Sequence, residues 1–209
     1  MEDGDAATLS VWAPDGDVLV VTSTINRQFG SMVMVDKGLL LNNAMHAFSV
    51  KGTKNALRLE PSAANLPLPG KMPMSSMAPS IVTNKGRAIT AIGGGGGSAA
   101  ISALLSAISL TGDKNILGAK FLASEVNSVR FHPKLVPYEV EVEPEKDTAK
   151  QSPKIKEVLE AQGHKVVFKV REETHISGIQ WDEKTNRRCA FADHRVDGAV
   201  NGTQEGQIE

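Results

Sequence analysis

Five consecutive glycines, residues 93–97, constrain the fold of this chain more than any other feature. The segment before them predicts a β-hairpin over 80–92, and the segment after them, 98–110, predicts a helix. The helix prediction rests on apolar residues at helical spacing and on Ser98, whose hydroxyl suits the N-cap. Small residues occupy the other faces, so we expect a helix buried on more than one side.

The residues around the glycine run indicate which kind of ligand its backbone amides could bind. Bare backbone amides at a helix N-terminus attract anions, which fits a phosphate cradle or an oxyanion hole for acyl transfer. No Gly-Lys-Ser/Thr triplet follows, and the spacing lacks the alternation and distal acid of a dinucleotide loop. A nucleotide site is therefore disfavoured, while an oxyanion hole and a flexible turn both stay open.

Charge and cysteine content exclude several classes of partner. The chain has 23 Lys+Arg against 24 Asp+Glu, a formal net charge of −1, and no long basic run. Phosphate neutralisation drives binding to nucleic acids and anionic membranes, so we expect no nucleic acid and no membrane contact. A single cysteine, Cys189, excludes an intrachain disulfide and a multi-thiolate zinc site. The five histidines are scattered, so we expect no metal and no cofactor.

The remaining pattern predicts an α+β fold in one domain over residues 1–200, with a frayed tail over 201–209. Apolar residues make up 41% of the chain, enough for a core, and the few aromatics make that core aliphatic. The other predicted elements are a hairpin over 9–24 around an Asp-Gly turn, an extended segment over 32–41, an irregular excursion over 51–79, a solvated crossing over 139–151, a helix over 152–163, and strands over 165–170, 175–181 and 187–192.

Two polar motifs have plain structural interpretations when taken alone. Ser75-Ser76 lies in the predicted excursion and indicates turn chemistry. Asp193-His194-Arg195 follows the last predicted strand, where charged residues are usually solvated, so it predicts a surface corner.

Several short motifs occur in one order over about residues 4–110. They are Leu9-Ser10-Val11 with Asp15-Gly16, Thr22-Ser23-Thr24-Ile25-Asn26 with Phe29-Gly30-Ser31, Leu40-Leu41-Asn42-Asn43, Pro69-Gly70-Lys71 with Ser75-Ser76-Met77, and Gly96-Gly97. Together they resemble the light chain of gamma-glutamyltransferase, also called gamma-glutamyltranspeptidase or glutathione hydrolase. The rest is similar more loosely, mainly through the last strand pair and Ala192-Asp193 with Arg195.

The resemblance implies the light-chain half of an N-terminal-nucleophile hydrolase, a four-layer αββα sandwich. In that family a precursor cleaves itself to expose a threonine, which attacks a γ-glutamyl amide with its own amine as base. The implied partners are a heavy-chain subunit and, for an active protein, glutathione or other γ-glutamyl compounds. By the same resemblance, Thr24 supports the nucleophile and Asn26 binds the donor's α-amino end. Ser75 and Ser76 bind its α-carboxylate, and the amides at Gly96 and Gly97 form the oxyanion hole.

The departures from the family fall on the chemistry. Counting back from Leu9-Ser10-Val11 places Ala6 at the nucleophile and Thr8 where the family has histidine. The acids that bind a substrate's ammonium are replaced in Asn42-Asn43-Ala44-Met45-His46-Ala47-Phe48. The family's Pro-Arg-x-His segment after the buried helix is expected to be absent.

Three hypotheses follow, and the sequence does not decide whether the chain is an enzyme. The first is an active transferase or hydrolase that uses Thr8 as a shifted nucleophile. The second, which the losses favour, is a family member that keeps the fold and loses the chemistry. The third is a fragment without an independent fold. No location is predicted: the chain would be cytoplasmic if expressed alone, and extracellular or at the cell surface within a family-like precursor.

Overall fold

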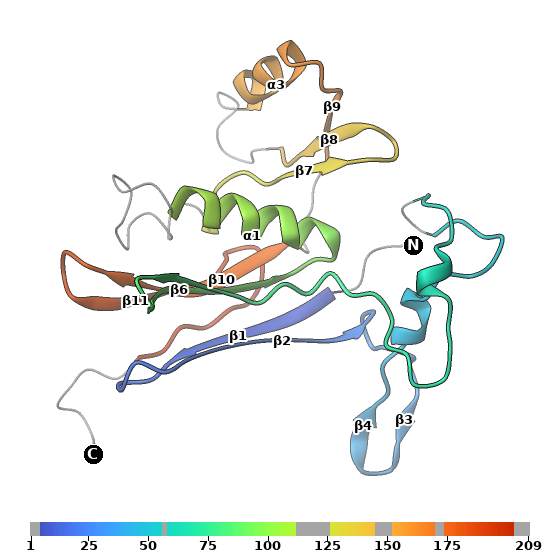
Figure 1. Ribbon diagram of the computed structural model, residues 1–209, viewed down its shortest axis with the longest axis horizontal. Helices are drawn as coiled ribbons and strands as arrows, with labels where there is room; N and C mark the ends of the chain where they lie inside the picture. The colour runs from blue at the N-terminus through green and yellow to red at the C-terminus, as the bar shows by residue number, and fades with distance from the viewer. Residues whose placement is uncertain (1–4, 56–57, 112–125, 145–151, 170–173, 203–209) are drawn as a thin grey trace.

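The centre of the molecule is a four-stranded antiparallel sheet in the order β11-β10-β6-β5 (Figure 1). The computed structural model describes residues 5–55, 58–111, 126–144, 152–169 and 174–202. The strands of this sheet are β5 (Ser80–Asn84), β6 (Arg87–Gly95), β10 (His175–Asp182) and β11 (Arg187–Phe191).

Two further layers pack on this sheet, one on each face. Helix α1 (Ser98–Thr111) covers one face, and the hairpin of β1 (Asp5–Trp12) and β2 (Val18–Asn26) covers the other (Figure 1). The order helix, sheet, sheet supplies three layers of a four-layer sandwich.

The remaining described elements lie outside these layers (Figure 1). Strands β7 (Phe131–Lys134) and β8 (Glu139–Val142) are antiparallel, and β9 (Val166–Phe168) is parallel to β8 because helix α3 (Ser152–Ala161) crosses between them. The short elements between β2 and β5 are β3 (Met34–Val35), β4 (Leu39–Leu40) and the 3-10 turns Asp36–Gly38, Ala44–Ala47 and Ala63–Asn65.

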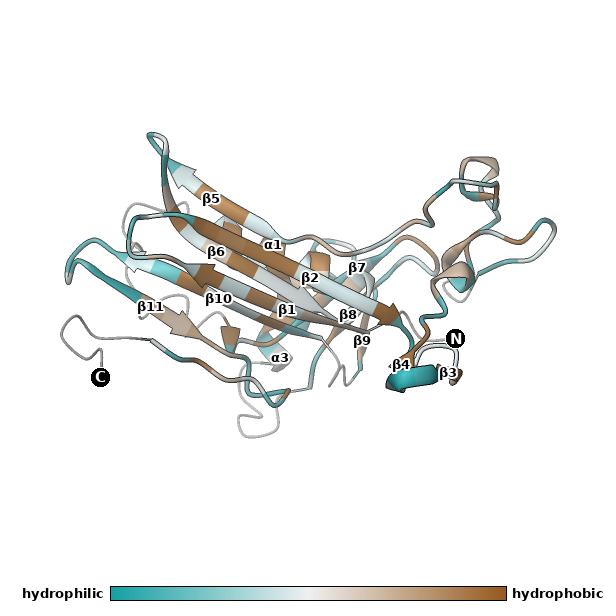
Figure 2. Ribbon diagram, turned by 90° about the horizontal axis from the view of Figure 1, so that it is seen from below, coloured by the Kyte–Doolittle hydropathy of each residue, from teal (hydrophilic) through white to brown (hydrophobic). Residues whose placement is uncertain are grey.

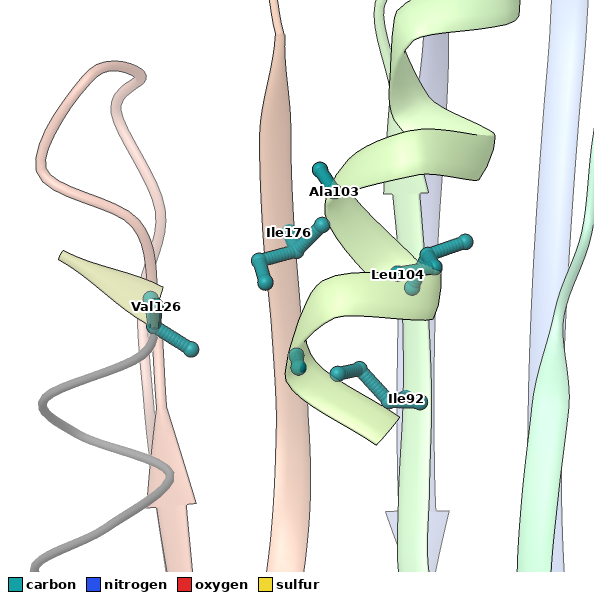
Figure 3. Close-up of a cluster of buried hydrophobic side chains, with 6 residues drawn as sticks. Ile92, Ala103, Leu104, Val126 and Ile176 are labelled. Carbon is teal, nitrogen blue, oxygen red and sulfur yellow. The ribbon is translucent and has the colours of Figure 1, made fainter. Parts of the chain in front are cut away.

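The aliphatic core lies between α1 and strands β6 and β10 (Figure 3). Alanines on α1 let the helix approach the sheet closely, so that Ile92 of β6 and Ile176 of β10 pack against it without exposed surface. The buried cluster consists of Ile92, Ala103, Leu104, Ala107, Val126 and Ile176.

Most predicted elements are confirmed. The first hairpin turns where expected, with the Ala13 amide donating to the Asp17 carbonyl at 2.8 Å and Gly16 at a φ of +103°. The helix after the glycine run, the helix that Gly163 ends, and the last three strands are also present.

Three predictions about elements need correction, and one strand was missed. The first three glycines of the run belong to β6, because a strand that pairs with β10 tolerates glycine where another layer comes close. Residues 32–41 form a small hairpin, in which Lys37 and Gly38 take positive φ, and not one extended segment. Residues 139–142 form a buried strand, because Glu141 is paired with lysines; residues 145–151 lie outside the described part. Strand β7 was not predicted.

Candidate functional site

Two glycines of β6 allow the β1–β2 hairpin to approach the central sheet. A Cβ atom added at Gly93 would overlap the Thr8 side-chain oxygen, and one added at Gly95 would overlap the Ala6 carbonyl oxygen. The overlap at Gly95 involves the backbone of β1 and can be relieved only by moving that strand, whereas the overlap at Gly93 would require the Thr8 side chain to move. The glycine run therefore brings the backbone of β6 against residues 6–8, as a site for a substrate amide requires.

The last two glycines make the turn from β6 into α1. Gly96 has a φ of +102° and Gly97 a φ of +64°, conformations that L residues with side chains rarely adopt. The turn ends at the N-terminus of α1, where the helix dipole adds positive potential. Because Gly95 contacts Ala6, this turn begins beside the first described residues of β1.

Ala6 and Thr24 lie at the same level of the β1–β2 hairpin. Asp5 is paired with Asn26 and Ala7 with Ser23, so a bulge places Ala6 across from Thr24 and its neighbour. Ala6 and Thr24 are both half-buried and belong to the alternate residues that face the central sheet. The Thr24 hydroxyl accepts a hydrogen bond from the Asn26 amide at 2.8 Å.

Asn26 is held by the Asn42-Asn43 motif. It has a φ of +75°, and its Nδ2 donates to the Asn43 carbonyl at 3.2 Å and to Asn43 Oδ1 at 2.9 Å. The Arg27 amide also donates to Asn43 Oδ1, at 3.1 Å. The side chain of Asn43 thus fixes the chain where it leaves β2.

Thr8 is placed inside the sandwich. Its Oγ1 donates to the Val21 carbonyl at 3.3 Å and lies 3.3 Å from Thr22 Oγ1, and it lies against Gly93. Its hydroxyl is therefore part of the contact between layers, two residues along β1 from Ala6.

His175 is a site residue that the sequence did not identify. It is paired with Gly95 across β10 and β6, and its imidazole lies where a Gly95 side chain would be, next to the Ala6 carbonyl. The side chain is buried. Only the register of β10 on β6 reveals this position, because the two residues are 80 apart in the chain.

The serine pair is less tightly defined. Ser75 is exposed and accepts the Met77 amide at 3.2 Å, and Ser76 is half-buried. Both precede Ser80, which is paired with Ile92, so the chain before β5 runs antiparallel to β6 from its glycine end. That the serines share a pocket with Thr24 and Gly97 stays a prediction.

Two members of the charged triplet near the end of the chain, Asp193 and Arg195, have buried side chains, so the prediction of a surface corner holds only for the exposed His194. Asp193 Oδ2 accepts from Arg130 Nη2 at 2.7 Å and from the Ile176 amide at 3.1 Å. Asp193 Oδ1 accepts from Arg195 Nη1 at 2.9 Å. Arg195 also donates to Glu143, at 2.9 and 2.6 Å. We call Arg130, Glu143, Asp193 and Arg195 the ion-pair cluster.

Pairing explains why these charges are buried. Burial by itself would raise the pKa of Asp193, but the Arg130 charge and hydrogen bonds from Arg195, Ile176 and Arg130 hold that pKa below its ordinary value. Burial would also raise the pKa of Glu143, but hydrogen bonds from the Arg195 side chain and the Arg130 amide outweigh that effect. The pKa of Glu143 is therefore lowered as well. Arg130-Phe131-His132 is an Arg-x-His triplet preceded by Val129, so the full Pro-Arg-x-His sequence does not occur here.

Within the described ranges, no group of three or more His, Cys, Asp or Glu side chains is placed to hold a metal ion. Among the helices described, none has the length and hydropathy to cross a membrane.

Sequence comparison finds one family. The family described as gamma-glutamyltranspeptidase matches residues 1–203. Two scoloptoxins of Scolopendra dehaani, SSD14 and SSD20, are 35% and 34% identical over 97% and 95% of this chain. The chain spans 34% of SSD14 and 96% of SSD20. The glutathione hydrolase proenzyme of Escherichia coli K12 is 35% identical over 80% of this chain, which spans 28% of that protein.

Solved structures agree with the sequence comparison. Gamma-glutamyltranspeptidase from Pseudomonas nitroreducens, complexed with L-DON, has a TM-score of 0.78 and 29% identity, covering 94% of this chain and 99% of that one. The T380A mutant of the Helicobacter pylori enzyme has a TM-score of 0.76 and 32% identity, covering 90% and 99%. The predicted α+β light-chain half of an N-terminal-nucleophile hydrolase sandwich is confirmed.

Proposed function

This chain belongs to the gamma-glutamyltranspeptidase family, and we propose that it keeps the family's γ-glutamyl-binding scaffold without the family's nucleophile. The observation that carries the proposal is the position of Ala6. Its backbone contacts Gly95 and it lies level with Thr24, where a nucleophile would meet the glycine turn, yet its side chain is a methyl group. A methyl group cannot form an acyl-enzyme.

The competing function, with Thr8 as a shifted nucleophile, has the geometry against it. Thr8 Oγ1 is directed at Val21 and Thr22 of the neighbouring strand and is packed against Gly93. To attack a substrate at the Gly96-Gly97 turn, Thr8 would have to become the first residue and move along β1 by two positions. That shift would break the hairpin register of β1 with β2.

The scaffold offers specific groups to a γ-glutamyl ligand. The Nδ2 group of Asn26 is engaged with Asn43, so a ligand ammonium would bind at Asn26 Oδ1. The ligand carboxylate would bind at Ser75 and Ser76, and its amide carbonyl at the amides of Gly96 and Gly97. With alanine at positions 44 and 47, no carboxylate there balances the ammonium, so binding is expected to be weak.

A heavy-chain-like subunit is the proposed partner, because an apolar surface of the described chain is exposed. The outer face of the β1–β2 hairpin carries Leu9, Val11, Leu19, Val21 and Ile25, and Figure 2 looks directly onto it. Leu9 is 58% exposed and Leu19 54%. A fourth layer on this face would complete the sandwich. We expect the isolated chain to self-associate, which sedimentation velocity would measure; a compact monomer would contradict this.

The test is an assay with a γ-glutamyl anilide, run on the chain alone and with a related heavy chain. We expect no release of aniline from the wild type or from Thr8→Ala. Ala6→Thr with Ala44→Glu and Ala47→Asp, in the presence of the heavy chain, is the variant expected to gain activity. Turnover by the wild type that disappears in Thr8→Ala would refute the proposal and establish Thr8 as the nucleophile. A thermal-shift titration with glutathione reports ligand binding separately from turnover.

A further inference from the structure

The methionines of this chain are exposed and lie mostly in one stretch of it. Six of the seven fall between residues 32 and 77, and all six have exposed side chains. Three of them follow one another closely, where Met72 is 86% exposed, Met74 65% and Met77 40%. Methionine normally fills gaps in a core, and a side chain in solvent fills none. Packing therefore does not account for three thioethers at these positions.

The backbone presents the three thioethers to solvent. Proline fixes its own φ and holds the residue before it in an extended conformation. Met72 and Met74 are exposed while Pro73 between them is half-buried, which is the alternation of an extended chain. Ser75 Oγ then accepts a hydrogen bond from the Met77 amide at 3.2 Å, and after this turn Met77 is exposed again. All three side chains therefore extend from the solvent-facing side of the segment.

The segment is held in place at its start. Asn65 Oδ1 accepts a hydrogen bond from the Met74 amide at 3.2 Å, and Asn65 Nδ2 donates to the Ala47 carbonyl at 2.9 Å. Lys71 Nζ donates to the Leu66 carbonyl at 3.1 Å. These bonds fix the backbone up to Met74, so a ligand that binds the thioethers has little backbone to order.

The surroundings select the kind of ligand. Lys71 is the one charged residue between residues 61 and 84, so the segment supplies no carboxylate for a hard cation such as Ca²⁺ or Mg²⁺. Zinc sites are built from thiolate, imidazole and carboxylate ligands, which are missing from this sequence as well. Thioether sulfur is a soft donor and suits Cu(I). The prediction of no metal rests on cysteine and histidine and takes no account of thioethers.

We infer that Met72, Met74 and Met77 form a three-thioether site for one Cu(I) ion. Two residues of extended chain span at most about 7 Å, and methionine has three rotatable side-chain bonds, so neighbouring sulfurs can reach one ion. The ligands are neutral and exposed, so the single positive charge of the ion stays in contact with water and needs no buried counter-charge. The inference is independent of the proposed γ-glutamyl function, because that ligand is assigned to none of these thioethers.

The test is titration of the full chain with Ag(I) in chloride-free buffer, followed by native mass spectrometry and by NMR of methionines labelled with carbon-13 at the methyl group. Ag(I) is the probe because it has the charge and softness of Cu(I) and keeps its oxidation state in air. The protein carries Cys189→Ser, because the free thiol would compete for a soft ion. We expect one ion per chain and shifts of three of the seven methyl signals.

The variants assign the shifted signals to residues. Met72→Leu, Met74→Leu and Met77→Leu should each remove one shifted signal and weaken binding by about 10-fold or more, the effect of disturbing even the outer shell of a metal site. The matched control is Met32→Leu with Met34→Leu, a second pair of exposed methionines two residues apart. It should bind Ag(I) as tightly as the parent. Far-UV circular dichroism melts establish that each variant is folded.

Several results would overturn the inference. They are the absence of a bound ion, full binding by the folded triple leucine variant, loss of binding in the control variant, and binding of Zn²⁺ as tight as that of Ag(I). Anaerobic competition with bathocuproine disulfonate then measures Cu(I) itself, and failure of Cu(I) to bind where Ag(I) binds would also overturn it. A glutathione titration of metal-free protein distinguishes failure here from failure of the γ-glutamyl proposal.

Discussion

The two ends of the sandwich are closed in different ways. At the glycine end, β6 presents no side chains, and β1 and β10 contact its backbone directly. At the opposite end, the rings of Trp12 on β1 and Trp181 on β10 lie between the layers with centroids 6.5 Å apart. The guanidinium group of Arg188 lies over the Trp12 ring, 5.8 Å from its centroid, and that of Arg87 lies over the Trp181 ring, 5.9 Å from its centroid.

The comparison shows where each end obtains its stability. Large side chains join the layers at the tryptophan end, whereas at the glycine end such side chains would fill the candidate site. The glycine end is stabilised instead by a side chain that lies beyond the two β-layers. Asp193 accepts a hydrogen bond from the amide of Ile176, the residue of β10 that is paired with Gly94 of β6. At the glycine end, buried ion pairs and hydrogen bonds therefore supply the stabilisation that contact between aromatic rings supplies at the tryptophan end.

The largest expected effect is from removing the central charge of the ion-pair cluster. Asp193→Ala leaves Arg130 buried without its closest carboxylate, and breaking a buried pair in this way costs about 3–5 kcal/mol. Urea denaturation followed by far-UV circular dichroism measures the loss. Asp197→Ala is the control, since that carboxylate is exposed, and an equal effect of both variants would contradict the role of the cluster.

The next effect is from adding a side chain at the glycine end. Gly95→Val would push against the Ala6 carbonyl and the His175 ring, and overpacking of this kind costs about 1–3 kcal/mol. The same denaturation experiment applies, and Gly202→Val is the control because nothing lies within 4 Å of a Cβ at that residue. Equal stability of the two variants would show that β1 can withdraw from β6 without cost.

The sequence predicted the tryptophan end better than the glycine end. Turn residues such as Asp15-Gly16 and strand alternation are local signals, so the hairpin and the last strands could be placed. The burial of Asp193 depends on Arg130, 63 residues away, and the position of His175 depends on its register with Gly95. Neither pairing leaves a local pattern, which is why a buried charge was predicted to lie at the surface.

Acid should weaken the glycine end selectively. The folded-state pKa values of Asp193 and Glu143 lie below their ordinary values of 3.8 and 4.5, so the unfolded chain takes up protons first as pH falls. The contribution of these two carboxylates to the free energy of unfolding is complete above their ordinary pKa values. It is lost as the pH falls through their folded-state pKa values, by at most about 1.4 kcal/mol per pH unit for each carboxylate. Urea midpoints between about pH 6 and 3 measure this. Asp193→Asn should lose less stability over that range than the wild type; parallel curves would contradict the prediction.

The smallest effect is the coupling between the two tryptophans. In a double-mutant cycle of Trp12→Leu and Trp181→Leu, we expect an interaction energy of about 0.5–1.5 kcal/mol, because the cycle isolates the contact between the two rings from what each substitution loses by itself. Each arginine pairs with one ring, so the single variants also lose a cation–π contact, which a parallel cycle of Arg87→Met with Trp181→Leu measures. Additive variants would show that the rings are neighbours without an energetic link. The two ends would then differ in side-chain size alone, and the tryptophan end would rely on buried area as the helix core does.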